Sequence, residues 1–417
     1  MAENKEKKVL NVPNLRFPEF EGEWENCKVS ELLDFYSTNS LSWDKLEYGT
    51  NAILNLHYGL IHVGLPTMVD LDNDKLPNIV SGNTPKNYEL CQEGDIAFAD
   101  ASEDTNEVAK AVEFYNLSGK NVICGLHTIH GRDNQHKTIV GYKGYAFSST
   151  AFHQQIRRIA QGTKIYSINS KNFSECYIGI PSKGEQKKIA TLLRLIDERI
   201  STQNKIIEEL KQLKNGISLN LFTNRIIFDK QITLSKCGTL RNGYAFKSST
   251  YNLKGKYSII TIANVTGSRY IESVDCNKVT QIPEDIQSHQ ILSNGDILIS
   301  LTGNVGRVSL CTDGHFLLNQ RVGLFELSDS IDKEFIYQVL SSKHFENEMI
   351  AKGQGAAQMN INKNDVESYV IPYSTNLQNI RIVSSLLKSL DEKILTMEHL
   401  LLSYNKQKTY LLRQMFI

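Results

Sequence analysis

The chain has 417 residues, of which 41% are hydrophobic and 22% are charged, so it is long enough for two or three domains with real cores. Its 46 basic side chains balance 46 acidic ones, and this zero net charge excludes overall basicity as an argument for nucleic-acid binding. The seven cysteines are scattered, without a CxxC pair or a cysteine–histidine cluster of zinc spacing, which predicts idle thiols in a reducing compartment and no metal site.

The N-terminal residues 1–8 are charged and have no apolar core behind them, so they do not resemble a secretory signal. No run approaches the roughly 18 apolar residues that a membrane span needs. The sequence therefore predicts a cytoplasmic protein that does not enter a membrane.

Residues 1–22 form a lead-in whose bulky apolar residues, at 15–20, are expected to dock on the rest of the protein. The first globular region, 23–183, contains short β-branched and aromatic runs, at 53–58, 94–99 and 120–124, with a helix expected at 151–160. This mixture predicts an α+β domain with a mostly antiparallel, twisted sheet.

A long helix is expected over 184–228, because apolar residues recur at alternating spacings of four and three, as in the seam of a coiled coil. The seam is formed by Ile189, Leu193, Ile196, Ile200, Gln203, Ile207, Leu210, Lys214, Ile217 and Leu221. One such stripe alone is also compatible with an ordinary amphipathic helix that packs on a core.

A second globular region, 229–374, is again predicted to be mixed, with strands at 257–262, 295–300 and 316–318 and a helix at 333–350. A second long helix follows over 375–417. Adding 194 to each seam number gives a second seam, formed by Val383, Leu387, Leu390, Ile394, Met397, Leu401, Tyr404, Lys408, Leu411 and Met415.

The shared register indicates a tandem duplication, and other anchors support it. Asp197 is matched by Asp391, residues 94–96 repeat as 295–297, and residues 161–169 resemble 354–362. We expect the two helices, each about 50 Å long, to pair as an antiparallel coiled coil with pseudo-twofold symmetry between two unlike heads. Such a frame suits two different half-sites on duplex DNA, which has twofold axes of its own.

In this arrangement the sequence resembles the specificity subunits of type I restriction–modification enzymes over essentially its whole length. The resemblance depends on the two half-repeats, Leu-Arg-Phe-Pro at 15–18 before Trp24, Arg-Asn-Gly-Tyr-Ala-Phe-Lys-Ser at 241–248, the two Gly-Asp-Ile strands and the Asp-Glu pairs of the helices.

The resemblance implies that each head is a target-recognition domain for one half of an asymmetric bipartite DNA sequence, contacted in the major groove. It implies that the helices set the spacer and dock two modification (methyltransferase) subunits, joined by restriction subunits in the full complex. The chain would bind no cofactor, whereas S-adenosylmethionine, ATP and Mg are expected on the partners. The helix positions assigned to the spacer and to docking are Ile189, Leu193, Ile196, Ile200, Ile207, Leu210, Leu387, Leu390, Ile394, Leu401 and Leu411.

A search for catalytic motifs agrees that the chain itself is not an enzyme. It has no Asn/Asp-Pro-Pro-Tyr string of adenine methyltransferases and no GxxxxGK[S/T] loop. The complex it resembles is an adenine-N6 DNA methyltransferase and an ATP-dependent endonuclease.

Polar and basic residues in loops are the candidates for DNA contact, because such side chains hydrogen-bond to base edges and phosphates. For each one the alternative is a solvated loop or a turn cap, and Arg157 and Arg158 fit phosphate contacts better than base contacts. In the first head the candidates are Ser102, Asn106, His127, Thr128, His130, Arg132, Asn134, Arg157, Arg158 and Lys164. In the second head they are Lys247, Ser248, Ser249, Thr302, Asn304, Arg307, Asn319, Gln320, Arg321, Gln354, Gln358 and Asn360.

Two other hypotheses remain open at this point. The neutral charge also fits a non-catalytic coiled-coil scaffold with two heads that bind proteins or glycans. A self-contained methyltransferase or nuclease is disfavoured by the missing motifs.

Overall fold

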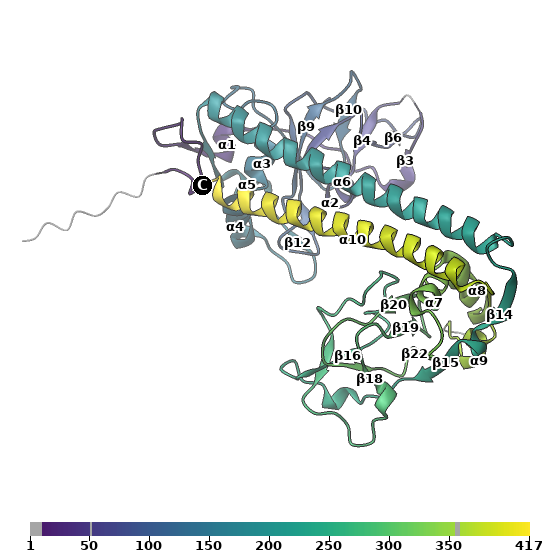
Figure 1. Cartoon of the computed structure of the whole chain (residues 1–417). Helices are drawn as coiled ribbons and strands as arrows, with labels where there is room; N and C mark the ends of the chain where they lie inside the picture. Colours follow the sequence, from purple (N-terminus) through teal and green to yellow (C-terminus); the bar gives the residue numbers. More distant parts are fainter. Residues whose placement is uncertain (1–10, 51, 355–358) are drawn as a thin grey trace, which may run out of the picture. The chain divides into compact units, whose positions relative to one another are not determined.

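The computed structural model describes residues 11–50, 52–354 and 359–417. The chain divides into two compact units: unit 1 comprises Met1–Asn204 and Leu400–Ile417, and unit 2 comprises Lys205–His399. The division falls inside both long helices, α6 (Lys183–Thr223) and α10 (Leu377–Gln414), which Figure 1 shows in teal and yellow. Each unit therefore contains one head and one segment of each long helix.

The head of unit 1 is built on two sheets and two strand pairs. The larger sheet has the order β2 (Asp34–Tyr36), β11 (Thr128–Arg132), β7 (Ile96–Ala99), β9 (Ala111–Asn116) and β5 (Met68–Asp70). The smaller has the order β10 (Val122–Cys124), β4 (Leu54–Leu56), β6 (Asn78–Ile79) and β3 (Leu46–Glu47). The pairs are β1 (Glu25–Lys28) with β13 (Tyr177–Ile180) and β8 (Ala101–Ser102) with β12 (Tyr166–Ser167).

Short helices accompany these strands. They are α1 (Val29–Leu32), α2 (Tyr58–His62), α3 (Lys143–Phe147), α4 (Thr150–Ile159), α5 (Ser170–Ser174) and the 3₁₀ turn η1 (Trp43–Lys45). The lead-in docks as expected, because Arg16 Nε lies 2.7 Å from Glu185 Oε1 and the Leu15 N–H donates to Gln414 O at 2.9 Å.

The head of unit 2 has the same plan with fewer strands. One sheet has the order β15 (Gly238–Asn242), β22 (Val322–Leu327), β19 (Ile297–Ser300) and β20 (Val308–Leu310). The other has the order β17 (Asn277–Val279), β16 (Tyr257–Ile260), β21 (Phe316–Leu318) and β18 (Ile291–Leu292), and β14 (Lys230–Thr233) pairs with β23 (Val370–Tyr373). The helices are α7 (Lys333–Leu340), α8 (Lys343–Gly353), α9 (Lys363–Glu367) and the 3₁₀ turns η2 (Leu234–Lys236), η3 (Ser248–Thr250) and η4 (Ser288–Gln290).

The duplication extends through the topology of both heads. The order β2-β11-β7-β9 recurs as β15-β22-β19-β20, and each neighbouring pair in both is antiparallel. The parallel pair β4–β10 recurs as β16–β21. The α+β class with a tandem internal repeat is thus confirmed.

The two long helices pair antiparallel within each unit. In unit 1, Lys408 Nζ lies 2.6 Å from Asp197 Oδ1. In unit 2, Lys214 Nζ lies 2.6 Å from Asp391 Oδ1. Adding 194 to 197 and 214 gives 391 and 408, so the same ion pair is made twice by duplicated residues with exchanged roles. The duplicated residues therefore make the same helix-to-helix contact in each unit.

The seam side chains are buried or half-buried, and they pack against their own heads as well as between the helices. In unit 1, Ile189, Leu193, Leu411 and Met415 share one core with the head. In unit 2 the duplicated positions, Val383, Leu387, Ile217 and Leu221, lie in or against the corresponding core. The seam therefore holds the helices to each other and to the heads, and these residues are not free to contact a partner directly.

Two helix bounds differ from the sequence predictions for local reasons. Helix α6 ends at Thr223 and not at 228, because the Asn224 side chain accepts a hydrogen bond from the Ile226 N–H at 2.9 Å and turns the chain. The expected helix at 333–350 is split into α7 and α8, since Ser342 caps a new helix by accepting from the Phe345 N–H. Within the described residues, no helix combines the length and apolar character needed to cross a membrane.

Candidate nucleic-acid interface

In each head a polar loop follows the strand that begins at the repeated Gly-Asp turn. Gly94 and Gly295 have φ values of 86° and 81°, in the left-handed region that glycine adopts without strain. The Asp95 carboxylate accepts from the Gln92 N–H at 2.9 Å, and Asp296 accepts from the Ser293 N–H at 2.8 Å. These matched turns start β7 and β19, and the candidate loops begin where those strands end.

In unit 1, contacts around the loop after β7 link Ser102, Asn106, His127 and Arg157, and Lys164 lies two residues before β12; we call these five predicted residues interface 1. Strand β8 pairs with β12, and Arg157 Nη1 donates to Asn106 Oδ1 at 2.8 Å. His127 Nδ1 lies 3.2 Å from Asp100 Oδ1, just before the loop. All five are exposed except the half-buried Ser102, so they form an accessible polar edge of the head.

In unit 2 backbone hydrogen bonds join four chain segments at the same edge, forming interface 2: Thr302, Asn304, Gln320, Arg321 and Asn360. The Leu301 N–H donates to Arg321 O at 3.0 Å, and Thr302 bridges to Asn360. The Gln320 N–H donates to Tyr244 O at 2.9 Å, which attaches the segment that leads to Lys247. Apart from the half-buried Thr302, these side chains are exposed.

The two interfaces occupy equivalent places in the repeat. The bridge of Thr302 to Asn360 in unit 2 corresponds to the pairing of Ala101 with Ser167 in unit 1. Likewise, the hydrogen bond from the Leu301 N–H to Arg321 O corresponds to the one from the Asp100 N–H to His127 O. His127 and Arg321 are therefore topological equivalents with different side chains. Equivalent frames that carry unlike exposed groups are suited to two different recognition tasks.

Four of the predicted DNA contacts have buried side chains that make hydrogen bonds within their own heads, and as DNA contacts they stay predictions. His130 Nε2 donates to the Asp95 carboxylate at 2.7 Å, and Arg132 donates hydrogen bonds to Asp95, Glu89 and the Leu90 carbonyl. Burial alone would raise the pKa of the Asp95 carboxyl, but the hydrogen bonds from His130 and Arg132 lower it. The buried Thr128 donates to Gly125 O at 2.6 Å.

Asn319 is the fourth buried residue, and its side chain accepts from the Arg321 N–H at 3.1 Å, which shapes the turn beneath interface 2. Asn134 is exposed, but it donates to Asp34 and Tyr36. Arg307 is half-buried, with Nε 3.7 Å from Glu346 Oε1. The exposed candidates Arg158, Lys247, Ser248, Ser249 and Gln354 stay predictions, and Gln358 lies outside the described residues.

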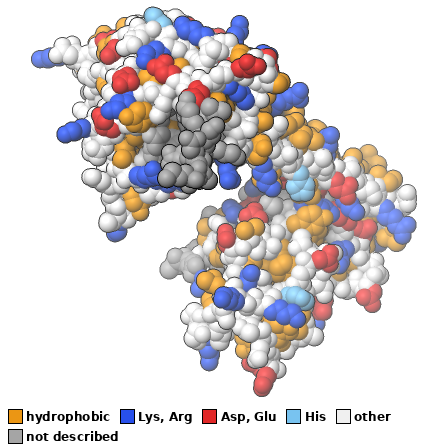
Figure 2. All heavy atoms as spheres, turned by 90° about the vertical axis from the view of Figure 1, so that its left-hand side faces the viewer, with side chains coloured by type: hydrophobic (Ala, Val, Ile, Leu, Met, Phe, Trp, Pro, Cys, Tyr) orange, Lys and Arg blue, Asp and Glu red, His pale blue; other side chains and the backbone are white. Residues whose placement is uncertain are grey.

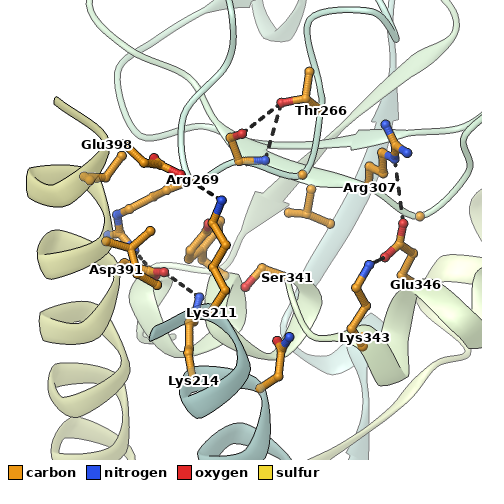
Figure 3. Close-up of a pocket in the computed structure, with 18 residues that line it drawn as sticks. Lys211, Lys214, Thr266, Arg269, Arg307, Ser341, Lys343, Glu346, Asp391 and Glu398 are labelled. Atoms are coloured by element: carbon orange, nitrogen blue, oxygen red, sulfur yellow. Dashed lines mark hydrogen bonds and ion pairs between the residues drawn. The ribbon is translucent and has the colours of Figure 1, made fainter. Parts of the chain in front are cut away.

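Sequence reasoning missed Arg269, which joins the second head to the long helices of unit 2 (Figure 3). Its guanidinium lies 2.9 Å from Asp391 Oδ2, 2.6 Å from Glu334 Oε2 and above the Tyr337 ring at 4.9 Å. This network lines a cavity of about 360 Å³ whose walls also carry Lys211. Nothing in the sequence marks Arg269, because its partners Glu334 and Asp391 are 65 and 122 residues away.

The surface carries basic and acidic side chains together. In the face shown in Figure 2, lysine and arginine are interspersed with aspartate and glutamate on both units. This agrees with the zero net charge of the chain.

Known proteins with the same architecture are type I specificity subunits. The family model described as "Type I restriction modification DNA specificity domain" matches residues 73–212 and again 230–402. The MjaVIII specificity subunit of Methanocaldococcus jannaschii is 28% identical over 277 residues, which are 60% of this chain and 64%, less than two thirds, of that protein. The putative MjaX specificity subunit of the same organism is 26% identical over 319 residues, 72% of each chain.

Solved structures agree at the level of the fold. The S subunit of a type I restriction–modification system from M. genitalium has a TM-score of 0.60 at 16% identity and covers 97% of this chain and 99% of its own. A chain from a study of type I R-M complex assembly and conformational transition has a TM-score of 0.56 at 13% identity, with 93% and 96% covered. Because the family model matches both halves of the duplicated frame, this chain belongs to the type I restriction–modification DNA specificity family.

Proposed function

We propose that this chain is the specificity subunit that gives a type I restriction–modification complex its DNA target. Interface 1 and interface 2 each contact one half of an asymmetric bipartite sequence in the major groove. The observation that carries the proposal is the pair of equivalent loop frames with unlike side chains, of which His127 and Arg321 are the clearest example. Arginine and asparagine on such loops can make bidentate contacts with guanine and adenine.

The long helices would set the spacer between the half-sites and dock two modification subunits. Their seam is occupied by internal contacts, so docking would use the outward faces. Apolar side chains there are 43–59% exposed, so they are available to a partner. They are Leu195, Leu213 and Leu219 on α6 and Ile382, Leu386 and Leu402 on α10.

In this proposal the chain performs no chemistry. S-adenosylmethionine, ATP and Mg would bind to the modification and restriction subunits, and the methylated adenine would be flipped out of the duplex by a modification subunit. The specificity subunit would decide only where that chemistry takes place.

The test is a genome-wide map of N6-methyladenine in otherwise identical cells with and without the gene, in the presence of its modification subunit. The proposal predicts one split motif that is methylated only when the gene is present. An unchanged methylation map, together with no salt-sensitive binding of duplex DNA by the assembled complex, would instead favour the protein- or glycan-binding scaffold.

A further inference from the structure

Two cysteines and a histidine meet in the core of the first head, although they are far apart in the sequence. Cys91, Cys124 and His130 each offer a ligand atom, and these three atoms all lie within 4.8 Å of one another. The sulfur atoms of Cys91 and Cys124 are 3.6 Å apart. All three side chains are buried. The spacing of the cysteines predicts no metal site, because this cluster follows from strand pairing and not from local spacing.

The histidine is oriented as a metal ligand would be. Its Nε2 lies 2.7 Å from Asp95 Oδ2, which fixes the ring and leaves Nδ1 for another partner. Nδ1 is buried and has no hydrogen-bond partner among the described residues. A histidine that ligates a metal through one nitrogen usually donates the other N–H to a carboxylate. A buried ring nitrogen without a partner is otherwise costly, so the arrangement calls for an occupant.

The second head shows what the same places hold when no such occupant is needed. Cys124 and His130 correspond to Leu318 and Leu324, since 318 − 124 and 324 − 130 are both 194, and the strand registers agree. Cys91 corresponds to Leu292, because both precede the matched aspartates, Asp95 and Asp296, by four residues. The bridge of Leu90 to Ile123 in the first head also recurs as the pairing of Ile291 with Leu317 in the second.

Those three leucines, at 292, 318 and 324, belong to one apolar core cluster. Leucine therefore fills all three core positions of this fold in the second head. The first head has replaced an apolar contact by two thiols and an imidazole, which packing alone does not require. The replacement points to a chemical role for these groups.

The ligand set and its dimensions suit a thiophilic ion. Zinc binds thiolate at about 2.3 Å and imidazole at about 2.0 Å, which in a tetrahedral site places two sulfurs about 3.8 Å apart. The observed 3.6 Å is close to that value. Two thiolates would balance the charge of a divalent ion, while Asp95 is balanced by Arg132 at 2.8 Å.

We propose that Cys91 Sγ, Cys124 Sγ and His130 Nδ1 form a structural site for a divalent ion of the zinc class in the first head, with Asp95 as the carboxylate that orients His130. The fourth position is open to a water molecule. The ion joins the end of β10, the middle of β11 and the segment before the Gly94 turn, and so stiffens the frame beneath interface 1.

The experiment is a titration of the full-length, reduced, metal-free chain with Zn²⁺ against a chelator, followed by X-ray absorption of the loaded protein. We expect one equivalent of zinc, a shell of two sulfur ligands and an imidazole, and a higher Tm. Titration with Co²⁺ should give intense thiolate-to-cobalt charge-transfer absorption. None of these measurements requires DNA, so a negative result would contradict the metal site and would leave the proposed function untouched.

The second head supplies the matched variant, Cys91→Leu/Cys124→Leu/His130→Leu, which installs its leucines. This variant should keep the circular dichroism spectrum of the parent, lose the zinc equivalent and show no rise in Tm with Zn²⁺. Cys176→Ser, at a buried cysteine elsewhere in unit 1, should still bind one equivalent. The proposal is overturned if the parent binds no zinc, if the triple variant binds as much, if the absorption shows no sulfur ligand, or if Cys91 and Cys124 form a disulfide in the purified protein in place of a metal site.

Discussion

Replacing Asp391 by alanine tests the internal anchoring of the helices in unit 2. The Asp391 side chain receives the Lys214 ammonium at 2.6 Å, the Arg269 guanidinium at 2.9 Å and the Gln338 amide at 2.7 Å. It is only 6% exposed, and the side chain of Arg269 is 5% exposed. Asp391→Ala would therefore remove a partner from the buried Arg269 and from the partly buried Lys214.

Removing one partner of a buried pair costs about 3–5 kcal/mol. Arg269 retains Glu334, to which both of its Nη atoms are bonded, so we expect a value near the lower end, about 3 kcal/mol. The matched control is Glu398→Ala, which removes a pair with Lys211 made on the same two helices at 2.9 Å. Both of those side chains are more than a third exposed, so this change should cost less than about 1 kcal/mol.

The assay is hydrogen exchange of the full chain, measured peptide by peptide, with urea unfolding as a second measure. A loss of 3 kcal/mol should accelerate exchange of the slowest amides in α7 and the first half of α10 by about 100-fold. Peptides of the unit 1 head should change much less. If the amides of α7 and α10 exchanged no faster in Asp391→Ala than in Glu398→Ala, the buried network would not be what holds the second head to its helices.

Three further predictions follow from particular side chains. Leu193→Ala should destabilise unit 1 by about 2–5 kcal/mol in urea unfolding because its side chain is fully buried, whereas Leu195→Ala, at 48% exposure, should change the free energy by less than about 0.5 kcal/mol. Burial raises the pKa of Asp296, so the contribution of this one carboxyl to the stability of unit 2 should fall as pH rises above about 4, where the unfolded chain gives up this proton first. The difference between the parent and Asp296→Asn, with unfolding measured across pH, should isolate that contribution. Arg157→Ala and Lys164→Ala should weaken DNA binding by the assembled complex without changing its motif and should each reduce the salt dependence by about one counterion in fluorescence anisotropy.

The long helices could be predicted because their signal is local and is repeated. A seam read from one stretch of chain needs no knowledge of distant contacts, and the constant offset of 194 shows that the second seam is a copy of the first. The matched seams are the reason that the helices were expected to pair, and the structure adds the Lys214–Asp391 and Lys408–Asp197 ion pairs, which obey the same offset.

The burial of individual strand residues could not be predicted in the same way. His130 and Arg132 lie in a polar-rich segment that is typical of an exposed loop, and their partner Asp95 is 35 and 37 residues upstream. Only the antiparallel pairing of β11 with β7 brings them inside. The bridge of Leu90 to Ile123 holds Cys91 beside β10, and with His130 on β11 it completes the cluster of Cys91, Cys124 and His130, whose irregular spacing carries no signal in the sequence.

The common topology of the heads was also hidden from the sequence. Strands of two to six residues are too short for reliable periodicity, and equivalent places hold chemically unlike residues, as with His130 and Leu324. Strand order depends on backbone pairing, which many side chains can satisfy. The repeat is therefore much clearer in the hydrogen-bond registers than in the residues.

The most direct test of the central claim is an adenine-methylation map from cells that carry Gln320→Ala/Arg321→Ala in interface 2 and nothing else changed. If each head contacts its own half of a split target, the motif should relax at positions in one half only, with the other half and the spacer unchanged. A map in which both halves change together, or neither does, would contradict the account.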